Sequence, residues 1–102
     1  MTPEQQKIHD VLIKRASDNG LILELGWLAC LDTMEPKAEY ANDLRLAFYA
    51  GAQHLFASIM VFMDEDHEPT KRDMDRMTKL FEEMQAIEPE LKLRGIVTKG
   101  SA

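Results

Sequence analysis

The stretch that decides the fold is LRLAFYAGAQHLFASIMVFM, which occupies residues 44–63. In its second part, residues 51–63, the only polar side chains are Gln53, His54 and Ser58. A helix that is apolar around its whole circumference must bury most of that surface. We therefore expect other helices of this chain, or those of a second copy, to cover it.

A membrane-spanning role for this stretch is disfavoured by its polar residues. A spanning helix needs about 20 predominantly apolar residues. Arg45, Gln53 and His54 interrupt the run, and ionisable groups inside a bilayer are costly. We expect a buried helix of a soluble protein and no membrane partner.

Two helices are expected before this stretch. Thr2-Pro3-Glu4-Gln5 has the pattern of a capped helix start, and spacings of three and four then place Ile8, Val11, Leu12 and Ala16 on one face. Asn19-Gly20 either ends this helix or only bends it. Residues 21–34 are too continuously apolar to show a period, but a strand would lack a partner, so a helix is favoured.

The long apolar helix is expected to begin with Pro36 in its first turn and to end near Met63. Residues 64–69 then form a short polar connection, and Thr70 with Asp73 resembles a capping pair that starts the last helix. Helices joined by so short a loop lie antiparallel. The sequence predicts an all-α fold, a three- to four-helix bundle that contains an antiparallel helical hairpin.

The length of 102 residues allows one domain with a modest core. We expect a single helical domain over residues 1–92 and a flexible C-terminal tail over residues 93–102. Self-association would add stability to so small a core. The expected state is a homo-oligomer, most simply a symmetric dimer, in which the long helix or residues 21–34 pair with their copy.

Charge and cysteine content restrict the partners and the compartment. The net charge is −6, and residues 64–90 alone account for −6, which argues against nucleic-acid binding. The single cysteine, Cys30, has no partner for an internal disulfide. These features, and an N-terminus that does not resemble a signal peptide, favour a reduced, cytoplasmic location.

Chemistry-bearing motifs are scarce. No His-Glu-x-x-His or Cys-x-x-Cys spacing occurs, the acidic run 64–68 lacks the glycine of a calcium loop, and no serine lies in a nucleophile elbow. We therefore predict no catalytic residue, no metal and no cofactor. The candidates that remain are for an interface or a buried polar network: Trp27, Arg45, Phe48, Gln53, His54, Leu55 and Ile59.

Three phrases of the sequence carry a resemblance: LELGWLA at 23–29, LRLAFYAGAQHLFASIM at 44–60 and EPTKRDMDRM at 68–77. They resemble a family of small, uncharacterised helical proteins encoded by tailed bacteriophages and prophages. The resemblance implies an accessory protein made in the cytoplasm of a bacterial host cell. It implies no activity and no catalytic residue.

Two functions of different class follow from these observations. The first is a non-enzymatic, oligomeric helical scaffold or assembly protein, indicated by the surplus of apolar helix. The alternative is an acidic inhibitor or adaptor that binds a host protein through its last helix. Apolar self-assembly should survive raised ionic strength, whereas acidic docking should weaken.

Overall fold

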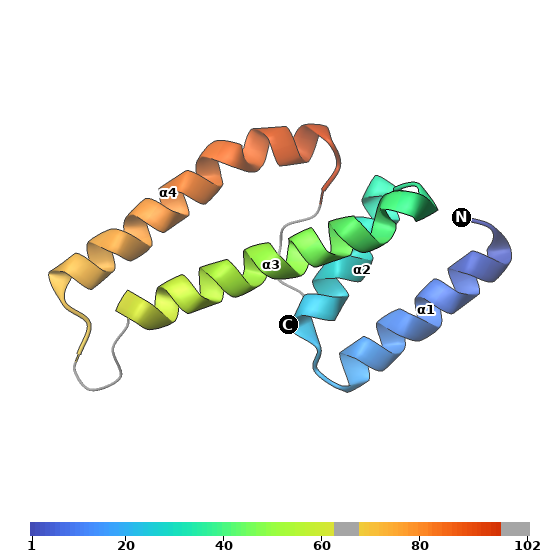
Figure 1. Ribbon diagram of the computed structural model, residues 1–102, viewed down its shortest axis with the longest axis horizontal. Coiled ribbons are helices and arrows are strands. Elements are labelled where there is room, and N and C mark those ends of the chain that lie inside the picture. Colours follow the sequence, from blue (N-terminus) through green and yellow to red (C-terminus); the bar gives the residue numbers. More distant parts are fainter. Residues whose placement is uncertain (63–67, 97–102) are drawn as a thin grey trace.

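The computed structural model describes residues 1–62 and 68–96 of the chain. Over these residues it contains four helices, α1 (Pro3–Asp18), α2 (Ile22–Met34), α3 (Ala38–Phe62) and α4 (Lys71–Leu93), and no strand (Figure 1). The all-α prediction is confirmed. The predicted connection lies for the most part outside the described residues, as does most of the predicted tail, although Leu93 still belongs to α4.

The helix starts agree with the capping patterns in the sequence. The Thr2 hydroxyl accepts from the Gln5 backbone N–H, and the Gln5 side chain accepts from the Thr2 N–H. Thr70 and Asp73 make the same reciprocal pair at the start of α4. Each pair satisfies two backbone donors that the first turn would otherwise leave open.

The chain turns sharply at both ends of α2. Asn19 caps α1 and Gly20 follows with φ +66°, so this pair ends the helix rather than bending it. Glu35 ends α2 in the left-handed conformation, with φ +44°. Glycine or asparagine usually occupies such a position.

The core lies where α1 packs on α2 and α2 packs on α3. Its buried apolar side chains are Ala16, Trp27 and Leu28, and His9 of α1 is buried as well. The predicted inner face of α1 is therefore wrong except at Ala16, because Ile8, Val11 and Leu12 are exposed. The face of α1 that meets α2 contains His9 and Ala16 instead. These two residues are seven positions apart and thus lie on one side of the helix.

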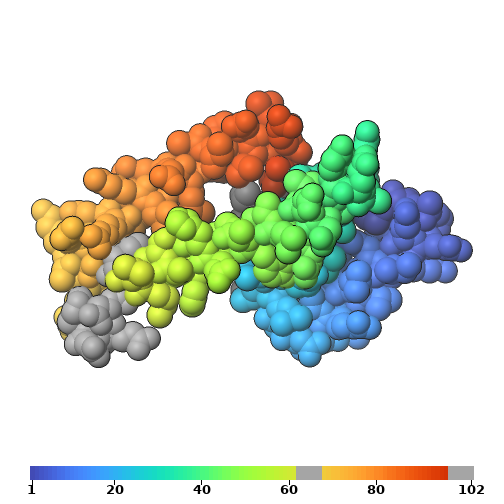
Figure 2. All heavy atoms as spheres, in the orientation of Figure 1, coloured from blue at the N-terminus to red at the C-terminus, as the bar shows by residue number. Residues whose placement is uncertain are grey.

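The last two helices run antiparallel, as the short connection predicts (Figure 1). Within the described part of the chain, however, α4 makes no extensive contact with another helix. A hollow separates α3 from α4 over part of their length (Figure 2). The apolar stripe of α4 consequently remains exposed at Met74, Phe81, Met84 and Ile87.

The resulting chain is open and elongated, with extents of 51 × 31 × 21 Å and a radius of gyration of 16.4 Å. A compact domain of this length has a radius of about 13 Å. Among the described residues, the second half of α3 is only partly covered, since Phe56 and Val61 are 66 % and 82 % exposed. Of the two expected covers, the described part of the same chain is thus insufficient for α3.

Candidate functional site

The polar contacts between α2 and α3 converge on one carboxylate. Arg45 Nη2 lies 3.1 Å from Glu24 Oε2, and the Tyr49 hydroxyl donates a hydrogen bond to the same oxygen. The Arg45 guanidinium carbon also lies 4.8 Å from the centre of the Tyr49 ring, within the range of a cation–π contact. We call Glu24, Arg45 and Tyr49 the α2–α3 polar cluster.

An aromatic group packs beside this cluster. The Trp27 and Phe48 rings are 6.0 Å apart and tilted by 53°, and the Phe48 and Tyr49 rings meet edge to face at 5.7 Å. Gly26 allows the close approach, because a Cβ atom placed there would lie 3.1 Å from Phe48 Cζ. The two helices are therefore fixed to each other by aromatic packing and by an ion pair at one place.

The electrostatics of the cluster keep its phenol protonated. Burial raises the pKa of Tyr49, and the hydrogen bond to Glu24 and the negative charge of that carboxylate raise it further. Arg45 acts in the opposite direction but does not cancel these effects. The protonated phenol of Tyr49 donates to Glu24, and the guanidinium of Arg45 balances the negative charge of that carboxylate. The cluster therefore has no net charge, and its three side chains are hydrogen-bonded or paired with one another.

The seven residues that the sequence proposed for an interface or a buried polar network fall into two groups, one at the α2–α3 contact and one further along α3. Trp27, Arg45 and Phe48 come together at the α2–α3 contact. Leu55 and Ile59 are half-buried further along α3. Gln53 and His54 are exposed and join no hydrogen bond of the cluster, so in this chain they are not part of a buried polar network with Arg45.

Helix geometry explains why His54 does not join Arg45. Nine residues at 100° each place His54 on the opposite side of α3, about 180° around the axis. Gln53 lies two turns away from Arg45 along the helix. Both side chains are therefore free for contacts outside their own chain.

Two members of the cluster, Glu24 and Tyr49, were not among the candidates. The sequence held a signal for Glu24, which is the single charged residue between Leu21 and Leu31. A lone charge in an apolar run must find a partner once the helix is packed. Tyr49 could have been found as the residue one turn after Arg45.

A second polar feature lies in a pocket of about 470 Å³ between α1, the end of α2 and the start of α3. His9 lines this pocket, is only 5 % exposed, and its side chain makes no hydrogen bond with the described residues. The other walls are mostly apolar, among them Leu12, Leu31 and Pro36. The pocket holds few convergent polar groups, whereas a catalytic site needs several.

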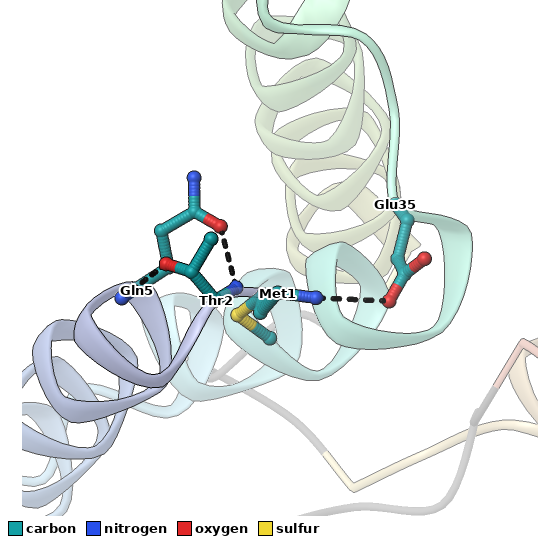
Figure 3. A network of polar contacts seen from close by, with 4 residues as sticks. All are labelled: Met1, Thr2, Gln5 and Glu35. Carbon is teal, nitrogen blue, oxygen red and sulfur yellow. Dashed lines mark hydrogen bonds and ion pairs between the residues drawn. The ribbon is translucent and has the colours of Figure 1, made fainter.

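Met1 and Gln5 at the start of α1 and Glu35 at the end of α2 also line this pocket. Met1 nitrogen lies 3.9 Å from Glu35 Oε1, and the Thr2 N–H donates to Gln5 Oε1 at 2.9 Å (Figure 3). The side-chain oxygen of Gln5 therefore belongs to the N-terminal cap of α1. Glu35 is largely exposed, so it does not form an enclosed acid–base pair with His9.

Two nucleophilic side chains of the helices, Cys30 and Ser58, have environments that do not activate them. Burial raises the pKa of the half-buried Cys30 thiol, which lowers its thiolate fraction. The Ser58 hydroxyl donates to the His54 backbone carbonyl at 2.8 Å. Over residues 1–62 and 68–96, no group of three or more His, Cys, Asp or Glu side chains could hold a metal ion.

Hydropathy along the described helices gives no candidate for a membrane crossing, because none combines sufficient length with sufficient apolar character.

Comparison with known proteins adds no relative. No protein-family model matches the chain, and neither a curated protein nor a solved structure is significantly similar to it. The relation to phage-encoded proteins therefore stays a prediction from the sequence.

Proposed function

We propose that this protein is a non-enzymatic, homo-oligomeric helical scaffold or assembly component. The observation that carries the proposal is the surface that a single chain leaves open. The chain exposes 8406 Å². A globular protein of 11.7 kDa exposes about 5,900 Å².

The surplus is large on the scale of protein interfaces. A standard interface takes about 800 Å² from each partner, and obligate dimers take more. Much of what is exposed is apolar, including Leu46, Phe56 and Met60 on α3. Several large apolar side chains exposed on one helix support a surface that binds another protein.

A scaffold also agrees with how the polar groups are used. Glu24, Arg45 and Tyr49 pair with one another at the α2–α3 contact, which supports a role in holding the two helices together. The setting we propose is that of a phage or prophage accessory protein in the bacterial cytoplasm. The three sequence phrases at 23–29, 44–60 and 68–77 support that setting.

The alternative is an acidic adaptor that binds a host protein. It draws on the second half of α4, where residues 80–91 carry Glu82, Glu83, Glu88 and Glu90 and no basic residue. The first half of the same helix is basic on balance, with Lys71, Arg72, Arg76 and Lys79 against two aspartates. An acidic docking surface would thus be limited to one end of α4.

Light scattering on a size-exclusion column, at ionic strengths of about 0.1 M and about 1 M, tests the proposal. We expect a particle of two or more chains at both salt concentrations, since apolar burial is insensitive to screening. A single chain of 11.7 kDa at both concentrations would refute the scaffold. Oligomers that dissociate at high salt would favour electrostatic docking instead.

A further inference from the structure

The pocket of about 470 Å³ between α1, the end of α2 and the start of α3 has the size of a small-molecule site. Such sites occupy about 300–1,000 Å³, and a few polar groups among apolar walls orient the ligand. Helix α1 supplies one wall with Gln5, Ile8, His9 and Leu12. These residues follow the spacing of a single helix face, so the whole wall belongs to one rigid element.

His9 brings an unpartnered polar group to this wall. Its side chain is 5 % exposed and makes no hydrogen bond with the described residues. Yet no side-chain nitrogen or oxygen of the described buried residues is both sealed from solvent and without a partner. The ring nitrogens of His9 therefore reach open space, and the pocket that His9 lines is the space beside them. A neutral imidazole offers one donor and one acceptor there.

The apolar wall of the pocket is also without a full cover among the described residues. Met1, Ile8 and Leu12 line the pocket and are 50 %, 61 % and 40 % exposed. Water can hydrogen-bond to His9, but it leaves this apolar surface hydrated. A molecule with an apolar body and one polar group would satisfy His9 and bury the wall at the same time.

The charges at the pocket favour a neutral ligand. Met1 nitrogen lies 3.9 Å from Glu35 Oε1, so these two charges already face each other (Figure 3). A charged ligand would lose hydration in the pocket without gaining an unpaired charge of opposite sign. A neutral hydroxyl group avoids this cost, and it matches a neutral imidazole because each has one hydrogen to donate and a lone pair to accept.

We propose that this pocket binds a small neutral molecule that has a compact apolar body and one hydroxyl group. The hydroxyl group hydrogen-bonds to the ring of His9, and the apolar body lies against Leu12, Leu31 and Pro36. This inference goes beyond the scaffold function and does not depend on it, because all the lining residues belong to a single chain.

Titration with 2-naphthol, followed by nuclear magnetic resonance, tests the site. We expect saturable shifts at the backbone amides of Ile8, Leu12 and Leu31, which line the pocket. The matched probe 2-naphthoate replaces the hydroxyl by a charge, and we expect it to bind at least about tenfold more weakly. The absence of saturable shifts at these residues would overturn the site, as it would if a side chain of a second copy filled the pocket. Equal or tighter binding of 2-naphthoate would overturn the preference for a neutral ligand.

His9→Leu separates the hydrogen bond from the apolar contact. Naphthalene is the probe without a hydroxyl group, and we expect the Kd of 2-naphthol to rise about five- to tenfold relative to that of naphthalene. His54→Leu is the matched control, since it makes the same substitution at an exposed position outside the pocket. It should leave both Kd values unchanged. An unchanged ratio of the two Kd values in His9→Leu would overturn the hydrogen bond to His9.

A second variant tests the pocket without a change at His9. Ala41 is half-buried and lines the pocket from α3, so Ala41→Phe places a ring in the space that the ligand needs. We expect the Kd of both 2-naphthol and naphthalene to rise at least about tenfold, and circular dichroism verifies that the variant is helical. Unchanged binding would show that the probes lie elsewhere and would overturn the site. The oligomer mass from light scattering is a separate measurement, so either proposal can fail alone.

Discussion

At the residue scale, the contact between α2 and α3 depends on one carboxylate oxygen that accepts from two groups. Glu24 is partly buried, and a carboxylate in such a place is costly unless it is paired and hydrogen-bonded. Arg45 supplies the opposite charge and Tyr49 supplies a second donor. Because both donors come from α3, the carboxylate fixes how α2 crosses that helix.

Removal of the phenol hydroxyl should weaken this contact. We expect Tyr49→Phe to lower the free energy of unfolding by about 1 kcal/mol, since one hydrogen bond to a charged acceptor is lost while Arg45 still pairs Glu24. Denaturant unfolding at equal protein concentration measures the change. Tyr40→Phe, at an exposed position, is the control and should change stability by less than about 0.5 kcal/mol.

The raised pKa of Tyr49 predicts a dependence of stability on alkaline pH. The folded state holds the phenol proton more tightly than the unfolded chain, in which the pKa is near 10. The stabilisation is therefore complete below pH 10 and is lost as the pH rises through the pKa of the folded state. We expect unfolding curves recorded from pH 8 upward to show a steeper loss for the unmodified chain than for Tyr49→Phe.

Cys30 contributes in the same direction and must be separated from this effect. Its pKa is raised above 9.0, so its stabilisation is also lost at high pH. The comparison is sound because both proteins retain Cys30. Parallel curves for the unmodified chain and Tyr49→Phe would show that the phenol is not responsible.

At the element scale, local signals predicted more than burial patterns did. Both capping boxes and the break at Asn19-Gly20 depend on a few neighbouring residues, and the sequence contains all of them. The buried face of α1 was predicted less well, because which side of a helix is covered depends on how its neighbour crosses it. For this reason His9 is buried and Ile8 is exposed.

The contacts of the polar cluster also could not be predicted from neighbouring residues in the sequence. Arg45 and Phe48 could be selected as candidates because they lie on a helix that is otherwise apolar. Their partners Glu24 and Trp27 are more than 20 positions away in the sequence, and only the crossing of α2 and α3 brings them together. The apolar character of α3 is visible in the sequence, but which of its side chains stay exposed among the described residues is not.

Two helical glycines give a matched test of the α2–α3 packing. A Cβ at Gly51 would meet no atom within 4 Å, so we expect Gly51→Ala to stabilise the protein by about 0.5–1 kcal/mol through helix propensity. A Cβ at Gly26 would press on Phe48, which is held by Trp27 and Tyr49. We expect Gly26→Ala to lower the melting temperature.

Thermal unfolding of both variants decides whether this contact is close-packed. Equal stabilisation by the two substitutions would mean that Phe48 can move aside without loss. The predicted difference in sign depends on packing alone, because both glycines lie within helices and gain the same propensity.

At the scale of the whole molecule, the chain divides into a packed part and an open part. Helices α1, α2 and the first half of α3 share the buried core around Trp27 and Leu28. The second half of α3 and α4 run antiparallel with a hollow between them (Figure 2), and many of their apolar side chains are exposed. In the oligomer that we propose, a second copy would cover the exposed apolar side chains of α3.

Small-angle X-ray scattering of the unmodified protein tests this central claim most directly, because it gives mass and size together. We predict the mass of at least two chains of 11.7 kDa and a radius of gyration above the 16.4 Å of one chain. A particle of one chain with a radius near 13 Å would show that α4 folds back to cover α3 itself. That result would contradict the account.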